Sequence, residues 1–97
     1  MGKCIGILPD NGNIYAPMKG RVVSVAETRH AIVIEGKRGR VLVHVGIDTV
    51  KLGAKAFALH VEEGSLVEAD TLLMEADLEM IRGAGLSTMV IVTVLNS

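Results

Sequence analysis

The sequence predicts an all-β fold, an antiparallel β-sandwich or barrel-like domain with short helical turns. Hydrophobic residues make up 49% of the 97 residues, which is typical of a packed core. They occur in short runs rich in Val and Ile, separated by Gly, Pro and Asn. Aromatic residues are only 2%, so we expect an aliphatic core. The length suits one domain over residues 1–97, and no apolar run approaches the ~20 residues of a membrane-spanning helix.

Five strands are expected in the first half of the chain. The clearest hairpin comes last, because two β-branched segments are joined there by Gly36-Lys37-Arg38-Gly39. A strong turn cluster, Pro9-Asp10-Asn11-Gly12-Asn13, ends the first strand and leads into the second. The expected strands are residues 5–8, 13–16, 21–26, 30–35 and 40–45.

The second half is expected to mix strands with short helical turns. Asp77 is a suitable N-cap for one helical turn through Ile81, which Gly83 and Gly85 would end. The other expected segments are a short extended piece at 47–50, a short helix or turn-rich loop at 54–63, a polar connection at 67–70, and strands at 71–76 and 88–95. The total is about seven strands.

Charge and cysteine content narrow the classes of function. The formal net charge is -1 with both signs mixed along the chain, which gives no electrostatic footprint for nucleic acid. We interpret the basic cluster Lys37, Arg38 and Arg40 as a solvated turn that can steer an acidic partner. The single cysteine, Cys4, is interpreted as a small half-buried residue. One cysteine and no secretion signal lead us to expect a cytoplasmic protein.

Two of the three histidines are candidates for chemistry because of where they lie on the predicted hairpin. His30 opens one strand and His44 closes the other, beside Gly46. If the turn centres near Lys37, the two residues are opposite each other, with Cβ atoms about 4.5–5.5 Å apart. A register shift of one residue would place them on opposite faces. His60 is distant in sequence, and we expect it to be a surface or packing residue.

Paired imidazoles suit three kinds of chemistry. They could bind a metal, although a structural zinc site uses four protein ligands and a catalytic one three. They could act as an acid–base pair, or one could be a nucleophile that the other positions. A largely neutral imidazole has a free nitrogen that can attack phosphorus, and a second one can donate a hydrogen bond to phosphoryl oxygens. The residues alone leave these alternatives open.

Beyond this pattern, residues 41–50 read V-L-V-H-V-G-I-D-T-V. This segment resembles the active-site signature of the glucose-type enzyme IIA of the bacterial sugar phosphotransferase system. The resemblance runs over nearly the whole chain and implies a glucose-permease IIA-like fold. The other matching segments, in order, are A-P-M-K-G at 16–20, E-T-R-H-A at 27–31, Phe57 with E-E-G at 62–64, D-T at 70–71 and D-L at 77–78.

The resemblance implies a phosphohistidine carrier, a component of a phosphotransferase. A histidine at the position of His44 accepts phosphate from the carrier protein HPr and passes it to a cysteine on the IIB domain of a sugar permease. His30 would support the phosphorylated state, with Thr28 near it, Gly46 orienting the His44 ring and Asp48 shaping the site. No cofactor is required. Some members bind zinc through the paired histidines at a partner interface.

Three departures from the family pattern shape further expectations. The match begins inside the family's domain, and it ends near a P-V-V-x-x-N segment that reads V-I-V-T-V-L-N at residues 90–96. We therefore expect a domain shortened at both ends, and a homo-oligomer that covers the exposed sheet edges. The hairpin between the histidines is also one residue short, which a β-bulge could absorb.

Two other functions compete with the carrier. A metallopeptidase of the lysostaphin type needs an H-x-H motif, but the residue two after His44 is Gly46. A shortened, non-catalytic relative would keep the fold and act, if at all, as a protein-binding module. The sequence does not identify the sugar.

Overall fold

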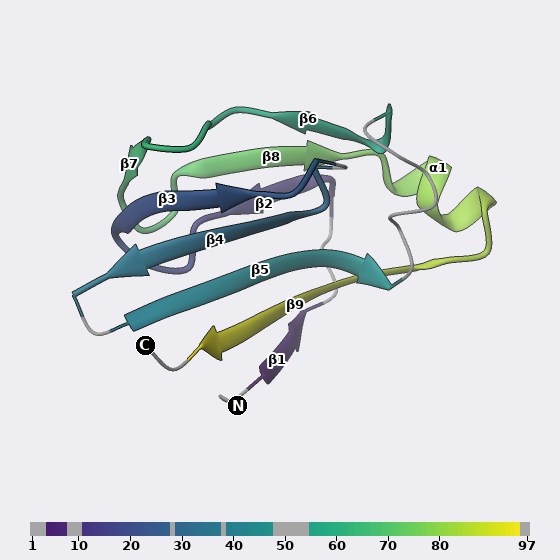
Figure 1. Ribbon diagram of the computed structural model, residues 1–97. Coiled ribbons are helices and arrows are strands. Elements are labelled where there is room, and N and C mark those ends of the chain that lie inside the picture. Colours follow the sequence, from purple (N-terminus) through teal and green to yellow (C-terminus); the bar gives the residue numbers. More distant parts are fainter. Residues whose placement is uncertain (1–3, 8–10, 28, 38, 48–54, 96–97) are drawn as a thin grey trace.

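Two antiparallel sheets pack face to face in the computed structural model, which describes residues 4–7, 11–27, 29–37, 39–47 and 55–95 (Figure 1). The larger sheet has the strand order β1-β9-β5-β4-β3-β7, and the smaller has the order β2-β8-β6. This arrangement confirms the predicted all-β antiparallel fold. Within the described residues, no helix is long and apolar enough to cross a bilayer.

The larger sheet consists of β1 (Cys4–Ile7), β3 (Gly20–Val25), β4 (Ala31–Gly36), β5 (Gly39–Ile47), β7 (Leu66–Val67) and β9 (Ser87–Leu95). The smaller sheet consists of β2 (Asn13–Tyr15), β6 (Phe57–Leu59) and β8 (Leu72–Ala76), and the helix α1 is Leu78–Gly83.

Two predicted segments differ from the structure. The expected helix or turn-rich loop at 54–63 contains strand β6, which pairs with β8 from Phe57↔Ala76 to Leu59↔Met74. The expected polar connection at 67–70 overlaps β7, whose Leu66 and Val67 pair with β3. Both strands are very short edge strands, so pairing with a neighbour defines them and hydrophobic alternation does not. Of the predicted piece at 47–50, residue 47 ends β5 and 48–50 lie outside the described residues.

The β4–β5 hairpin carries both candidate histidines near one end. Its ladder is continuous from Ala31↔His44 to Gly36↔Gly39. The hairpin therefore has no bulge between its own strands. Bulges occur instead where the hairpin pairs with its neighbours. One lies between Val22 and Ser24 of β3, in the β3–β4 pair. The other lies between Val45 and Ile47 of β5, in the β5–β9 pair.

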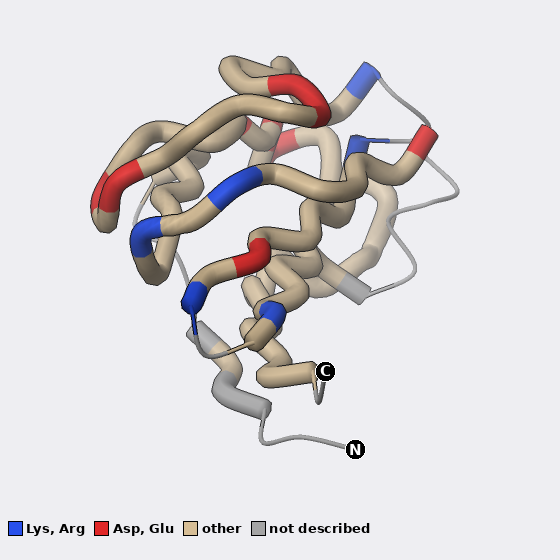
Figure 2. The backbone as a smooth tube through the Cα atoms, turned by 60° about the vertical axis from the view of Figure 1, so that its left-hand side comes forward, with Lys and Arg blue, Asp and Glu red and all other residues tan. Residues whose placement is uncertain are grey.

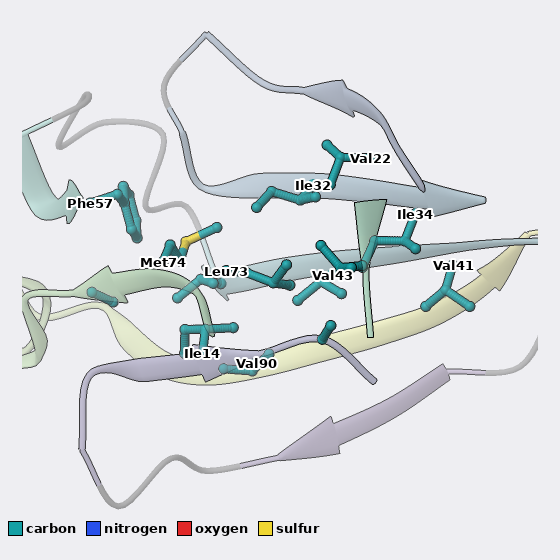
Figure 3. Close-up of a cluster of buried hydrophobic side chains, with 14 of the residues drawn as sticks. Ile14, Val22, Ile32, Ile34, Val41, Val43, Phe57, Leu73, Met74 and Val90 are labelled. Atoms are coloured by element: carbon teal, nitrogen blue, oxygen red, sulfur yellow. The ribbon is translucent and has the colours of Figure 1, made fainter. Parts of the chain in front are cut away.

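The core lies between the two sheets and is aliphatic, as the composition predicts. Alternate residues of β4 and β5, such as Ile32, Ile34 and Val43, are buried against Leu73 and Met74 of β8 (Figure 3). Asp77 caps α1, since its Oδ1 accepts a hydrogen bond from the Met80 amide at 3.0 Å. The predicted helical turn is thus confirmed, and this end of the chain is held against the core.

Candidate functional site: a histidine pair at the edge of the sandwich

His44 lies on β5, near the end of the hairpin that is remote from the turn. Its neighbours Val43 and Val45 are buried in the core, so strand alternation directs the half-buried His44 side chain to the other face. Its partners across the ladder are Ala31 on β4 and Ile91 on β9. The imidazole therefore lies in a row of small or apolar neighbours, on a strand that is paired on both sides.

His30 lies immediately before β4, where the chain enters the sheet. Its carbonyl accepts a hydrogen bond from the Val45 amide at 2.8 Å, and Ala31 is the residue paired with His44. The expectation that His30 and His44 are direct cross-strand partners is therefore wrong by one residue. The preceding residue, Arg29, has a φ of 64°, so His30 lies outside the regular strand and is not bound by its alternation of faces.

The two imidazole rings nevertheless meet. Their centroids are 4.9 Å apart and the ring planes are at 89°, an edge-to-face contact. The pairing predicted from the sequence is thus present, although it arises from the turn before β4 and not from direct register.

Phe57 of β6 is a third ring at this site. Its centroid is 6.5 Å from that of His30, with the planes tilted by 45°, and its side chain is only 3% exposed. Phe57 is one of the residues that resemble the family pattern, but the sequence does not predict its contact with the histidines. That contact crosses from one sheet to the other, so it depends on tertiary packing. The one available signal was that Phe57 is the single phenylalanine of the chain.

Burial lowers the pKa of His30 below its ordinary value of 6.5, and the charge of the nearby His44 lowers this pKa further. His30 is therefore neutral at neutral pH. A neutral imidazole has one N–H donor and one nitrogen acceptor, which suits it to orient a neighbouring group by hydrogen bonding.

Gly46 lies two residues after His44 and shapes β5 there. It is buried, has a φ of 75°, and lies at the β-bulge between Val45 and Ile47. A left-handed φ at this bulge favours glycine, and a bulge changes the direction of the strand beside it. The other two predicted site residues, Thr28 and Asp48, lie outside the described residues.

His60 belongs to a different surface, as expected. It is exposed beside β6, and its Nε2 lies 2.6 Å from Oε2 of Glu75 on β8. Across the described ranges, no group of three or more His, Cys, Asp or Glu side chains is arranged to bind a metal ion. The histidine pair by itself offers two nitrogen ligands, fewer than the three or four of a protein zinc site.

The two-sheet antiparallel fold is that of a glucose permease IIA. The structure matches the solved glucose permease IIA from Mycoplasma capricolum with a TM-score of 0.91 and 30% sequence identity, over 99% of this chain and 63% of that one. Residues 1–97 match the model of the phosphoenolpyruvate-dependent sugar phosphotransferase system, EIIA 1 family. The chain belongs to this family.

Two relatives carry a matching segment within longer proteins. A glucose-specific EIICBA component from Streptococcus pneumoniae is 46% identical over 97 residues, which are 99% of this chain and 13% of that protein. A glucose-specific EIIA component from Bacillus cereus is 39% identical over 98 residues, covering 100% of this chain and 59% of that protein. The chain therefore spans less than two thirds of the length of these relatives.

Proposed function

We propose that this chain is a phosphocarrier of sugar uptake, with His44 as the phosphoryl acceptor and His30 as its supporting residue. The observation that carries the proposal is the edge-to-face contact of the two imidazoles, 4.9 Å apart, in a chain of the EIIA family. The domain would act as a stoichiometric intermediate of a phosphotransferase.

The transfer consists of two displacements at phosphorus. In the first, a neutral nitrogen of His44 attacks the phosphoryl group on HPr; an N–P bond forms at His44, and the bond to the HPr histidine breaks. In the second, a cysteine thiolate of a IIB domain attacks the same phosphorus. A P–S bond forms, the N–P bond at His44 breaks, and its electron pair returns to the His44 nitrogen. Electrostatic stabilisation of the equatorial oxygens is the main demand of such steps.

His30 is suited to supply that stabilisation. Since burial and His44 keep its pKa below 6.5, it is a neutral ring whose N–H can donate to a phosphoryl oxygen. The bulge at Gly46 would set the direction of β5 beside the His44 ring. In this proposal Thr28 and Asp48 complete the surroundings of the two histidines. The transfer needs no metal, and a zinc ion bound by the pair would need further ligands from a partner.

Phosphorylation by labelled phosphoenolpyruvate, with enzyme I and HPr, tests the proposal. Wild-type protein is expected to take up acid-labile, base-stable label, and His44→Ala to take up none. His60→Ala is the matched control, because it removes an imidazole from a surface outside the site and should retain the label.

The His30 variant tests how the roles are divided. His30→Ala should still accept label but pass it slowly to a IIB cysteine. If His30→Ala blocks acceptance while His44→Ala is labelled, the two roles are reversed. Absence of label on folded wild-type protein would instead support a non-catalytic relative that acts as a protein-binding module.

A further inference from the structure

The turn that leads into His30 contains a residue with an unusual backbone. Arg29 has a φ of 64°, in the left-handed region that residues with a Cβ rarely adopt. Among the described residues other than glycine, only Asp70 shares a positive φ, at 69°. Aspartate is enriched in this region and arginine is not. Such a conformation costs free energy, and proteins tend to retain it where a functional site depends on it.

Hydrogen bonds hold the backbone on both sides of Arg29. Its amide donates to the Ala26 carbonyl at 2.8 Å, which closes a β-turn over residues 26–29. The Ala26 amide in turn donates to the Ala31 carbonyl at 3.0 Å, and the Val45 amide donates to the His30 carbonyl at 2.8 Å. His30 therefore lies between a closed turn and the start of β4, and the left-handed residue sets the direction in which the chain enters His30.

Regular strand pairing would not bring the two imidazoles together. Ala31 pairs with His44, so extending the same ladder by one residue would pair His30 with Val45. Cross-strand partners share a face of the sheet, and Val45 is buried in the core at 0% exposure. A regularly paired His30 would thus face the core, on the side opposite to His44. The observed ring instead contacts both His44 and Phe57 of the smaller sheet.

The side chains of the turn give it no net charge. Glu27 and Arg29 are both exposed and of opposite sign, and Figure 2 shows an acidic and a basic segment on this turn. Neither side chain makes an ion pair with a residue that the structure describes. Backbone conformation, and not charge, is therefore the property of position 29 that bears on the His30 ring.

We propose that Arg29 is a positioning residue, whose left-handed backbone turns the His30 ring out of strand register and against His44. The inference rests on the proposed carrier function, because it assigns Arg29 a part in phosphoryl transfer through His30. Misplacing a group that orients the reacting atoms by about 1 Å can cost about a hundredfold in rate. The backbone of residue 29 would thus determine how well His30 reaches phosphoryl oxygens on His44.

Substitutions that differ in their tolerance of a left-handed backbone test the proposal. Arg29→Val places a β-branched side chain in this region, which strongly disfavours it. This variant should lose the nuclear Overhauser contact between the His30 and His44 rings, and should pass label to a IIB cysteine at least about tenfold more slowly. Arg29→Asn is the conservative variant for this backbone. Arg29→Asn and Arg29→Gly should both keep the ring contact and the transfer rate, although they remove the guanidinium.

Asp70→Val is the matched control, because it makes the same change at the other left-handed position. Asp70 precedes Leu72 at the start of β8, whereas Phe57 pairs with Ala76 at the far end of that strand. Asp70→Val should therefore lower the urea midpoint, as Arg29→Val does, but leave the ring contact and the transfer rate unchanged.

Three results would overturn the proposal. Loss of the ring contact in Arg29→Gly would assign the role to the guanidinium. A folded Arg29→Val protein that keeps the contact would show that the left-handed backbone is not required. Loss of the contact in Asp70→Val would assign the effect to general loosening of the fold. If the wild type takes up no label, the carrier function fails, and the ring contact in the variants still decides the role of Arg29.

Discussion

At the scale of single residues, the protonation of His30 links the site to stability. Its folded pKa lies below 6.5, so the unfolded chain binds more protons than the folded one between these two pKa values. Stability is therefore retained above about pH 6.5 and decreases as the pH falls through the folded pKa of His30. His30→Gln removes this contribution.

We expect the urea midpoint of the wild type to fall more than that of His30→Gln between pH 7.5 and pH 5. Equilibrium unfolding of the two proteins at several pH values measures the difference. Parallel curves for the two proteins would show that His30 has an ordinary pKa in the folded state.

Phe57 is expected to maintain the surroundings of His30. Phe57→Leu should cost about 1–2 kcal/mol of stability and admit water beside the imidazole, so that the pKa of His30 rises toward its ordinary value. Ile34→Val is a matched core control of similar cost, about 0.5–1.5 kcal/mol, at the other end of β4. NMR titration of the His30 ring in both variants measures the effect. A pKa that moves equally in both would assign the change to general loosening of the core.

At the scale of elements, close approach of backbones at Gly12 ties β2 to the end of β8. The Gly12 carbonyl accepts a hydrogen bond from the Ala76 amide at 2.7 Å, and a Cβ at Gly12 would collide with the Ala76 carbonyl oxygen. We expect Gly12→Ala to destabilise the protein by about 2 kcal/mol.

Gly83→Ala is the control for this substitution. Nothing lies within 4 Å of a Cβ at Gly83, and the residue ends α1. Alanine has the higher helix propensity, so this variant should be unchanged or more stable by up to about 1 kcal/mol. Urea unfolding of both variants decides the point, and a similar loss in both would contradict the steric account.

Local sequence signals predicted the elements that local chemistry defines. Glycines bounding the turn predicted the β4–β5 hairpin, and Asp77 predicted the start of α1. They did not predict β6, because its three residues become a strand by pairing with the distant β8. Local signals also predicted that His30 and His44 meet. They did not predict that His44 pairs with Ala31, one residue away from His30. That offset depends on the left-handed backbone at Arg29, and nothing in the residue type indicates it.

At the scale of the whole molecule, the association state is a prediction that follows from the sheet edges. Strand β1 pairs with β9 on one side and is the last strand of its sheet in the described part of the chain. Such an edge offers backbone groups to another chain. We expect a homo-oligomer, and sedimentation velocity at micromolar concentration measures it. Strictly monomeric protein would contradict this expectation.

The position of the histidines within one hairpin has a consequence for folding. The cost in chain entropy of closing a loop grows with its length, and the β4–β5 hairpin closes a far shorter loop than the β5–β9 ladder, which joins Arg40 to Leu95. Closing the hairpin loop therefore costs about 1 kcal/mol less in chain-entropy free energy than closing the β5–β9 loop. Opening of β9 would remove Ile91 from beside His44 but leave both imidazoles on the same local unit. The contact between the two rings therefore depends on closing the short β4–β5 loop. The packing of Ile91 beside His44 depends on closing the long β5–β9 loop.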